Sequence, residues 1–250
     1  MRYLRARYDG QDFHAALEDG RVKRLNGSPY ESAQFTGEEY SLNNVKLLPP
    51  SEPTKIVAVG LNYAKHAAEM KETLLGRPVI FLKPTTALIA HGEEIVWPAA
   101  AAQVDHEAEL ALVIGKTCKN VTPEEASTYI FGYTALNDVT ARDLQKADGQ
   151  WTRGKSFDTF CPVGPYVDTD FVPAHRRVQS ILDDEVKQDG NTDDMLFTPA
   201  ELVSFISECM TLLPGDIIAT GTPEGIGPMR RGSVIEIRIE GLETLRNSVT

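Results

Sequence analysis

Three acidic side chains alternate along one short segment, Val104 to Leu110, which reads Val-Asp-His-Glu-Ala-Glu-Leu. If this segment is a strand, successive side chains point to opposite faces, so Asp105, Glu107 and Glu109 share one face. Like charges side by side repel, and burying an ionised carboxylate without a partner is costly. A hard divalent cation such as Mg²⁺ or Ca²⁺, which prefers oxygen ligands, would resolve the conflict. The alternative is an edge strand whose acidic face meets water.

A further carboxylate lies where a predicted strand ends and a predicted helix begins. Asp138 follows the apolar pair Ala135-Leu136 and comes shortly before Thr140. Ligands gather at strand ends in α/β-type cores, which favours a place for Asp138 beside the acidic strand. The alternative is helix capping, in which Thr140 and Asp143 form the cap pair and Asp138 supports it.

His66 and Glu69 are three residues apart in a segment that predicts a short helix over residues 63–71. That spacing puts both side chains on one face of the helix. A histidine that is oriented by a carboxylate can act as a general base for water. The alternative is an ordinary pair on the surface of a helix, and spacing alone does not separate the two.

Two further segments could meet an anion. Lys155 lies between Trp151 and Phe157, which indicates partial burial where a lone lysine would otherwise be solvent-exposed. The glycine-rich loop over residues 220–227, which contains Gly221, follows a predicted strand and could present backbone N–H groups to an anion. The loop lacks the Lys-Ser/Thr of a P-loop, which argues against nucleotide binding.

Strands dominate the elements that must hold these side chains. The first fifty residues contain short alternating stretches and end at a proline-rich break over residues 47–53, which indicates a domain boundary. The sequence therefore predicts an α+β fold that is mainly β, with a small N-terminal β domain over residues 1–50 and the main domain over residues 51–250. Short helices are predicted to begin near Tyr63, Thr122, Thr140 and Thr198. The strands of the main domain are expected at residues 55–60, 78–84, 107–115, 131–136, 217–220 and 234–239.

Composition narrows the class of partner. The chain has 250 residues, of which 42% are hydrophobic, and this is enough for a sizeable core. Its net charge is −11 and no cluster of lysine and arginine marks one face, so we expect neither a nucleic-acid partner nor an anionic membrane surface. An acidic protein that binds an anionic substrate needs positive charge at the binding site, and a metal ion is a simple way to supply it.

The cysteines and the apolar runs bear on the compartment. The three cysteines, Cys118, Cys161 and Cys209, are widely spaced and form no Cys-x-x-Cys pair, which favours a reducing compartment over a disulfide framework. The first residues are too polar and alternating for a signal peptide, and no apolar run approaches the roughly 20 residues of a membrane span. We therefore expect a soluble, cytoplasmic protein.

Taken together, these segments resemble the fumarylacetoacetate hydrolase family, and most closely its branch of acylpyruvate hydrolases, oxaloacetate decarboxylases and 2-hydroxyhepta-2,4-diene-1,7-dioate isomerases. The match covers roughly residues 55–250, and it is the set of segments that is specific rather than any one of them. The matching segments are residues 59–63 with His66 and Glu69, Phe81-Leu82-Lys83-Pro84, residues 105–110, residues 137–145, Lys155-Ser156-Phe157-Asp158-Thr159, Leu213-Pro214-Gly215-Asp216, Thr220-Gly221-Thr222-Pro223 and Leu245-Arg246-Asn247.

The resemblance implies a fold and a set of ligands. It implies a mixed β-sandwich roll for the main domain and, commonly, a homodimer. It implies that Glu107, Glu109 and Asp138 bind Mg²⁺ or Mn²⁺. It also implies that His66 and Glu69 are a pair on a mobile lid helix that activates water or steers an enolate. The positions that would face a small anionic 2-oxo acid are Arg142, Gln145, Lys155 and Thr222, beside Gly221.

The implied chemistry leaves the reaction open. A metal that chelates the substrate carboxylate and 2-oxo oxygen would stabilise an enolate, with Lys155 supplying positive charge nearby. Hydrolysis, decarboxylation and tautomerisation share this enolate, so fold and ligands do not separate them. Because the His66–Glu69 pair is present, we expect hydrolysis or decarboxylation of an acylpyruvate-type or oxaloacetate-type acid. One alternative is an isomerase or tautomerase of 2-hydroxy-dienoates or oxaloacetate in aromatic catabolism. The other is a non-catalytic, metal-stabilised scaffold, which would need neither His66 nor Lys155.

Overall fold

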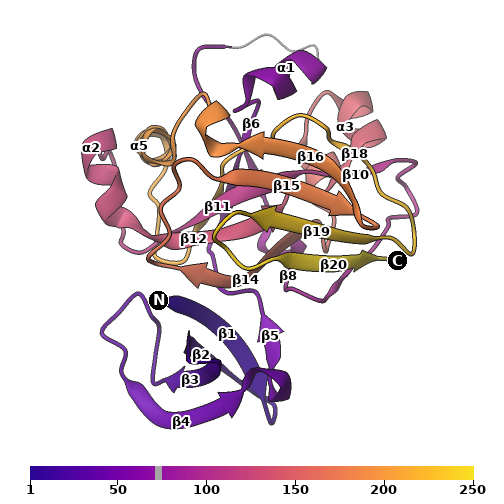
Figure 1. Cartoon of the computed structure of the whole chain (residues 1–250). Coiled ribbons are helices and arrows are strands. Elements are labelled where there is room, and N and C mark those ends of the chain that lie inside the picture. The colour runs from indigo at the N-terminus through magenta and orange to yellow at the C-terminus, as the bar shows by residue number, and fades with distance from the viewer. Residues whose placement is uncertain (71–74) are drawn as a thin grey trace.

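A computed structural model describes residues 1–70 and 75–250. Strands far outnumber helices in it, and the predicted α+β fold that is mainly β is confirmed. Figure 1 shows a body of packed sheets with the first strands, coloured indigo, forming a lobe beneath it. No helix in the described part of the chain is long and apolar enough to cross a membrane.

The N-terminal lobe is a meander of antiparallel strands. Two tight turns connect its first three strands, and each turn is an Asp-Gly pair with positive φ at both residues: 48° and 75° at Asp9 and Gly10, and 50° and 73° at Asp19 and Gly20. Such turns match the twist of a hairpin, which is why Asp-Gly sits there. The strands are β1 (Arg2–Tyr8), β2 (Gln11–Glu18), β3 (Arg21–Leu25), β4 (Phe35–Ser41) and β5 (Lys46–Leu48).

The lobe is continuous with the body through one strand pair. Strand β1 pairs antiparallel with β14 (Cys161–Asp168), and Arg2 is opposite Asp168. The strands of the lobe and part of the body therefore form one 12-stranded sheet. Its main path runs β4-β3-β2-β1-β14-β12-β11-β17-β6-β7, with β5 paired to β1 and β8 paired to β14. Its other members are β6 (Ile56–Gly60), β7 (Val79–Lys83), β8 (Leu88–Ile89), β11 (Ala108–Ile114), β12 (Ile130–Asn137) and β17 (Ile217–Ala219).

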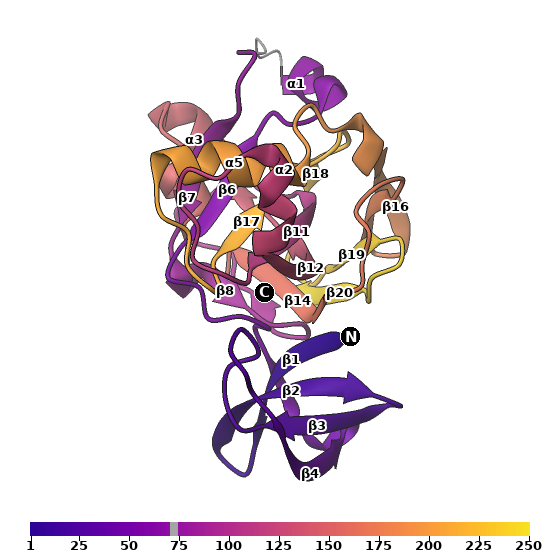
Figure 2. The same cartoon turned by 90° about the vertical axis from the view of Figure 1, so that its left-hand side faces the viewer.

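A second sheet faces the first across the main core. Figure 2 shows it opposite β11, β12 and β14. Leu110 and Leu112 of β11 share the core with Ile237 of the second sheet, whereas Ala111 and Val113 pack into a separate core on the other face. Strand β11 is thus buried on both faces, as its apolar run predicts. The second sheet contains β16 (Glu185–Asn191), β15 (Arg177–Leu182), β19 (Val234–Ile239), β20 (Leu245–Val249) and β9 (Glu94–Ile95), in that order.

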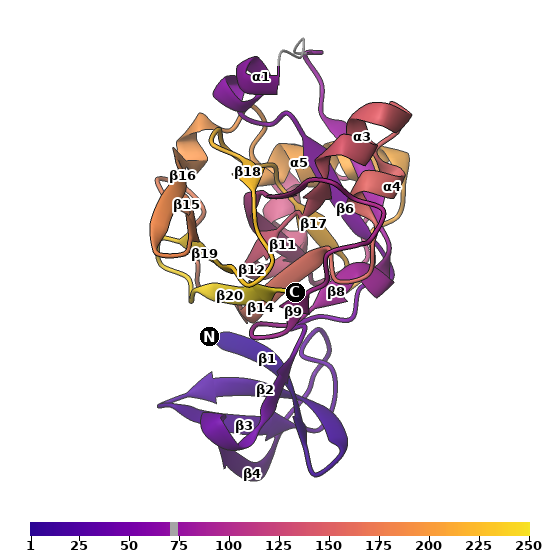
Figure 3. The same ribbon diagram turned by 90° about the vertical axis from the view of Figure 1, so that its right-hand side faces the viewer.

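A third, small sheet and the helices surround one end of the body. Figure 3 shows α3 and α4 near β6, with α1 at the end of the molecule away from the N-terminal lobe. The small sheet is β13 (Thr140–Ala141), β10 (Val104–His106) and β18 (Gly227–Pro228). The helices are α1 (Ala64–Met70), α2 (Pro123–Ala126), α3 (Arg142–Asp148), α4 (Thr152–Lys155) and α5 (Pro199–Cys209). Short 3₁₀ turns cover Leu42–Asn44, Thr85–Ala87, Ser127–Tyr129 and Thr192–Asp194.

The predicted helix starts have mixed outcomes. At α5, the Thr198 backbone N–H donates to Glu201 (2.7 Å) and the Thr198 hydroxyl accepts from the Glu201 backbone N–H (3.3 Å), which is a capping box. The cap pair of Thr140 with Asp143 is wrong. The carboxylate of Asp143 accepts from backbone N–H groups of residues 102–103 instead, and Thr140 turns toward the acidic residues described below. The end of the helix predicted over residues 63–71 lies outside the described residues.

Several strands escaped prediction, among them β14, β15, β16 and β20. Strand β14 contains Pro162, Gly164 and Pro165, residue types that are depleted in strands. Strand β16 is mostly polar, so its own sequence pattern does not predict a strand. Its backbone is held extended by antiparallel pairing with β15.

Candidate metal centre and active site

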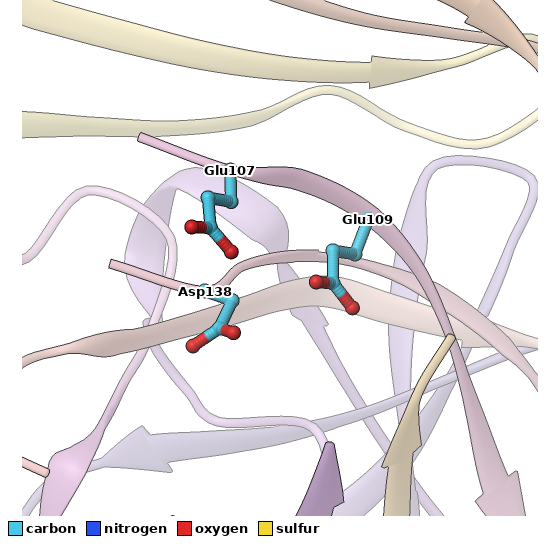
Figure 4. A group of neighbouring side chains, drawn as sticks. All are labelled: Glu107, Glu109 and Asp138. Carbon is cyan, nitrogen blue, oxygen red and sulfur yellow. The ribbon is translucent and has the colours of Figure 1, made fainter. Parts of the chain in front are cut away.

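Glu107, Glu109 and Asp138 come together at one end of the large sheet. Ligand oxygens of the three side chains lie within 4.8 Å of one another. Figure 4 shows the three carboxyl groups gathered at one place, with Glu107 and Glu109 on one segment of the chain and Asp138 on another. All three residues are buried, with at most 4% of the surface of any of them exposed. Buried carboxylates this close need a cation, and three oxygen donors of this kind fit Mg²⁺ or Mn²⁺.

The backbone explains why these residues meet. The acidic segment is not one strand: β10 ends at His106, β11 begins at Ala108, and Glu107 lies at the break. The Glu107 backbone N–H donates to the Asn137 side chain (2.9 Å), and the Glu107 carbonyl accepts from the Asp138 N–H (3.0 Å). These two hydrogen bonds fix the end of β12 against the break, so Asp138 lies beside Glu107.

The break separates Asp105 from the other acids. We expected Asp105 to share a face with Glu107 and Glu109 on one strand, but β10 belongs to the small sheet instead. The Asp105 carboxylate accepts hydrogen bonds from Arg142 Nε and from Gln103 Nε2, each at 2.8 Å. Asp105 thus holds Arg142 in place and stands outside the cluster of possible metal ligands.

Glu107 and Glu109 have opposite electrostatic surroundings. Burial opposes ionisation of Glu107, but the charges of Lys155 and Arg142 outweigh it and hold its pKa well below the usual range. Burial and the nearby charges of Asp138 and Glu107 raise the pKa of Glu109 well above the usual range. Among the described residues, no cationic side chain pairs with Glu109. A divalent cation bound at the triad would favour the ionised form of this carboxylate.

Two buried lysines hold Asp138 from both sides. Lys155 Nζ donates to Asp138 Oδ2 (2.6 Å) and to Glu107 Oε2 (2.7 Å), and Lys83 Nζ donates to Asp138 Oδ1 (2.5 Å). Burial lowers the pKa of Lys155, but the charges of Asp138 and Glu107 outweigh it and raise that pKa above its usual value. With Asp105 counted beside the three possible metal ligands, this region has four carboxylates against three cations: Lys83, Lys155 and Arg142. Adding a divalent cation would leave it with one net positive charge, which suits an anionic substrate.

The predicted His66–Glu69 pair is present on α1. His66 Nδ1 lies 3.2 Å from Glu69 Oε2, and only 6% of the surface of His66 is exposed. The Glu69 carboxylate also accepts from the backbone N–H of Gly225 at 3.1 Å. Lys65 Nζ lies 3.4 Å from the Glu224 carboxylate. Helix α1 is therefore bound to the glycine-rich loop as well as carrying the pair.

One cavity of about 260 Å³ collects these side chains. It brings together the predicted metal ligands, the histidine and the predicted substrate-facing residues. Apolar residues also line it, among them Leu61, Met70, Phe81 and Trp151. The polar residues that line it are His66, Glu107, Glu109, Asp138, Arg142, Gln145, Lys146, Lys155 and Thr222.

The residues predicted to face the substrate are largely engaged with the protein. Arg142 donates to Asp105 and Glu107, and its Nη1 donates to Gln145 Oε1 (2.6 Å). The Thr222 hydroxyl donates to the Ala108 carbonyl (2.8 Å) and accepts from Gln188 (2.8 Å). Substrate contacts by Arg142, Gln145 and Thr222 stay predictions.

Gly221 has a partner within the protein, and its contact with substrate stays a prediction. Its backbone N–H donates to Glu109 Oε2 at 2.8 Å, so the anion that it meets is the protein's own carboxylate. The loop does present an N–H group to an anion, as its glycines indicate, and the effect is to orient a metal ligand.

Sequence reasoning assigned no role to several residues of the site. Lys83 was visible only as part of a matching segment, because a lone lysine on a predicted strand gives no sign that it is 1% exposed. Phe81 was likewise visible only in that segment, Trp151 only as a neighbour of Lys155, and Lys146 gave no signal. Their approach to the acidic residues depends on the pairing of β6 with β7 and on the path of α3 and α4.

The fold and this cavity together define a class: a mainly β, α+β protein with a candidate centre for a divalent cation. Comparison with known proteins gives the family. Residues 55–250 match the fumarylacetoacetate (FAA) hydrolase C-terminal family, and residues 1–50 match the Rv2993c-like, N-terminal family. The chain belongs to the fumarylacetoacetate hydrolase family, whose enzymes include hydrolases and isomerases and often use a divalent metal.

Relatives and solved structures agree over nearly the whole chain. The chain is 50% identical over 216 residues to protein MJ1656 of Methanocaldococcus jannaschii, covering 86% of this chain and 89% of that one. A 2-hydroxyhepta-2,4-diene-1,7-dioate isomerase from Mycobacterium marinum superposes with a TM-score of 0.93 at 42% identity, covering 100% and 98%. A maleylpyruvate hydrolase from Sphingobium superposes with a TM-score of 0.83 at 30% identity, covering 100% and 99%.

Proposed function

We propose that this chain is a metal-dependent enzyme that converts a small 2-oxo acid through an enolate, by C–C hydrolysis of an acylpyruvate-type acid or by decarboxylation of an oxaloacetate-type acid. The observation that supports it is a single cavity lined by the buried triad of Glu107, Glu109 and Asp138 and by His66, whose Nδ1 contacts Glu69. A scaffold would need the first of these and not the second.

The chemistry divides between the ion and the chain. A bound divalent cation would act as a Lewis acid on the carboxylate and 2-oxo oxygen of the substrate. Lys155 stands beside Glu107 and Asp138, and its ammonium group would attract negative charge that develops on the substrate. Glu107 and Asp138 hold that ammonium in place before substrate arrives, so little reorganisation is needed.

His66 is the residue that would take a proton from water. Glu69 contacts Nδ1, which leaves Nε2 as the ring nitrogen available to water or substrate. Because Glu69 also accepts from Gly225, the pair is oriented by the loop that carries Gly221. Helix α1 then covers the cavity with the base already aligned.

The decisive experiment is a panel of 2-oxo acids assayed with Mg²⁺, in which cleavage, CO₂ release and tautomerisation are read separately. We expect cleavage of an acylpyruvate or CO₂ release from oxaloacetate, and we expect both to disappear in EDTA. Activity that is equal with and without EDTA would contradict the metal-dependent reaction. Turnover confined to tautomerisation would contradict hydrolysis and decarboxylation alike.

A second candidate is an isomerase of 2-hydroxy-dienoates, and one observation favours it. The structure from Mycobacterium marinum bears an isomerase name and is more similar to this chain, at 42% identity, than the maleylpyruvate hydrolase at 30%. Isomerisation needs the same enolate, followed by return of a proton to a different carbon. Loss of the dienoate ultraviolet absorbance without release of a second product would support this candidate over cleavage.

A further inference from the structure

One buried side-chain amide joins the second sheet to the segment that carries the metal ligands. Gln188 is 0% exposed, although it lies on β16, most of which is exposed. Its Oε1 accepts from the Ala108 backbone N–H (2.9 Å) and lies 3.2 Å from His106 Nδ1. Its Nε2 donates to the Thr222 hydroxyl and to the Pro223 carbonyl, each at 2.8 Å. The amide thus uses both lone pairs of its oxygen and both hydrogens of its nitrogen.

The orientation of this amide follows from its partners. The Ala108 N–H can only donate and the Pro223 carbonyl can only accept, so the oxygen of Gln188 must face the first and its nitrogen the second. A side chain of the same length without these atoms could fill the space but could not form these bonds.

The amide fixes the residue that separates Glu107 from Glu109. The Ala108 N–H belongs to the peptide unit shared with Glu107, and Gln188 accepts from it directly. The Ala108 carbonyl belongs to the peptide unit shared with Glu109, and it accepts from the Thr222 hydroxyl (2.8 Å), which Gln188 holds in turn. Strand β17 pairs with a later part of β11, so at Ala108 side chains take the place of a neighbouring strand. The backbone directions of both glutamates therefore depend on Gln188.

A β-bulge beside Gln188 turns this side chain inward. Gln188 pairs with Ser180 of β15. The next residue of β15, Ile181, pairs with Val186, so Lys187 is an extra residue in β16. Bulges of this kind bend a strand and change the direction in which a neighbouring side chain points.

Two glycines let β16 approach the glycine-rich loop closely enough for these bonds. A Cβ atom at Gly225 of the loop would lie 2.3 Å from the Lys187 carbonyl oxygen. A Cβ atom at Gly190 of β16 would lie 2.4 Å from the Pro223 side chain. Both distances are too short for any other residue type, so the bulge, the loop and Gln188 form one closely packed unit.

We propose that Gln188 is a positioning residue that fixes the separation of the Glu107 and Glu109 carboxylates and thereby makes the centre select Mg²⁺ over Ca²⁺. Mg²⁺ demands near-ideal octahedral geometry with short bonds to oxygen, whereas Ca²⁺ accepts longer bonds and variable geometry. A backbone that is held on both sides of Ala108 favours the more demanding ion. This inference rests on the proposed function, which places a divalent cation at the triad.

The experiment compares Gln188→Met with Asn247→Leu by titration calorimetry of the metal-free proteins with Mg²⁺ and, separately, with Ca²⁺. Asn247 is a matched control, because it is 2% exposed and its Nδ2 donates to the carbonyls of Ala90 (2.8 Å) and Glu93 (2.7 Å), away from the triad. Gln188→Met should weaken Mg²⁺ binding by about 10- to 100-fold, the usual effect of losing a group that orients a metal ligand. It should weaken Ca²⁺ binding by a smaller factor. Asn247→Leu should keep both affinities.

The ratio of the two affinities is the informative quantity. A residue that only stabilised the fold would lower the melting temperature and leave this ratio unchanged, as we expect of Asn247→Leu. Mg²⁺ affinity that survives in Gln188→Met, or equal losses for the two ions, would overturn the positioning role and leave the proposed function standing. If the unaltered protein binds neither ion, the triad is not a metal centre, and the proposed function fails together with this inference.

A second variant tests the same role if Gln188→Met does not fold. Thr222→Val removes only the hydroxyl through which Gln188 holds the Ala108 carbonyl. It should weaken Mg²⁺ binding more than Ca²⁺ binding, by smaller factors than we expect for Gln188→Met. An unchanged ratio of the two affinities in folded Thr222→Val would overturn the proposal.

Discussion

Gly221 donates its backbone N–H to the Glu109 carboxylate at 2.8 Å, and this bond joins the glycine-rich loop to the candidate metal centre. Glu109 is the member of the triad whose ionisation is opposed by burial and by its neighbours, so its pKa is raised. A neutral hydrogen-bond donor orients the carboxylate without neutralising it. A cation bound at the triad would add the positive charge that favours the ionised form of Glu109, in the same direction as the hydrogen bond from Gly221.

The first prediction concerns binding of the ion. Mg²⁺ at about 100 times its dissociation constant should stabilise the folded protein by about 2.7 kcal/mol, because it binds only the folded state. For a chain of this size that corresponds to a rise in melting temperature of roughly 5 °C or more. Glu109→Gln removes a charged ligand and should abolish most of the rise. Equal melting temperatures in EDTA and in excess Mg²⁺ would show that the triad does not bind the ion.

The second prediction concerns pH in the absence of metal. Because the pKa of Glu109 is raised in the folded protein, the folded state retains a proton that the unfolded state has already released above its ordinary pKa. Stability from this group is therefore present at low pH and is lost as pH rises through the raised pKa. In EDTA, Glu109→Gln has no such proton to lose, so it should gain stability relative to the unaltered protein as pH increases from 5 to 9. A difference in melting temperature that does not change over this range would contradict the raised pKa.

The third prediction uses the backbone at Gly221. Its φ is +95°, and a Cβ atom there would lie 2.7 Å from the Asn62 side chain. Gly221→Ala should lower the free energy of unfolding by about 1–3 kcal/mol and should also weaken Mg²⁺ binding, since the N–H that orients Glu109 moves. Gly92→Ala is the matched control, because Gly92 has a φ of +82° with nothing within 4 Å of the added atom. Gly92→Ala should lower the free energy of unfolding through backbone strain only and should leave Mg²⁺ binding intact.

Much of this site could be read from the sequence, and the reasons are local. Glu107 and Glu109 are two residues apart, and the apolar run after them predicts a buried strand. A bound cation was then one of two interpretations, beside a solvent-facing edge strand, and the family resemblance favoured the cation. His66 and Glu69 are on one helix face by spacing alone. What these predictions share is that each depends on residues close together in the chain.

The parts that were missed depend on residues far apart in the chain. Lys83 contacts Asp138, which is 55 residues further along the chain, because β7 pairs with β6 in the large sheet. The local spacing of hydrophobic and polar residues does not predict such a contact. Asp105 was placed with Glu107 because a strand was assumed to continue, and a break between β10 and β11 moved it to Arg142. The oligomeric state and the cellular compartment stay predictions. The contacts within a single chain reveal neither a partner chain nor the compartment in which the chain works.

The last prediction separates cleavage from tautomerisation with two variants. Lys155→Met keeps the apolar stem and deletes the charge beside Asp138 and Glu107, so it should abolish turnover of every substrate while Mg²⁺ still binds. His66→Ala should leave Mg²⁺ affinity intact and lower kcat for acylpyruvate cleavage by about 10²-fold or more, the usual size of a general-base contribution. Glu69→Ala should give a smaller loss in the same direction, because it orients the histidine and does not accept the proton.

The two variants should diverge on one reaction. Enol–keto exchange of oxaloacetate can take its proton from solvent, so His66→Ala should slow it far less than it slows cleavage, whereas Lys155→Met should suppress both. Ultraviolet absorbance follows the exchange, and product analysis follows cleavage of an acylpyruvate. His175→Ala is the matched control, since His175 is an exposed histidine paired with Asp193 outside the cavity, and it should change neither rate. Equal losses of both reactions in His66→Ala would mean that the histidine transfers protons in every reaction, and the preference for a hydrolase over an isomerase would lose its support from the His66–Glu69 pair.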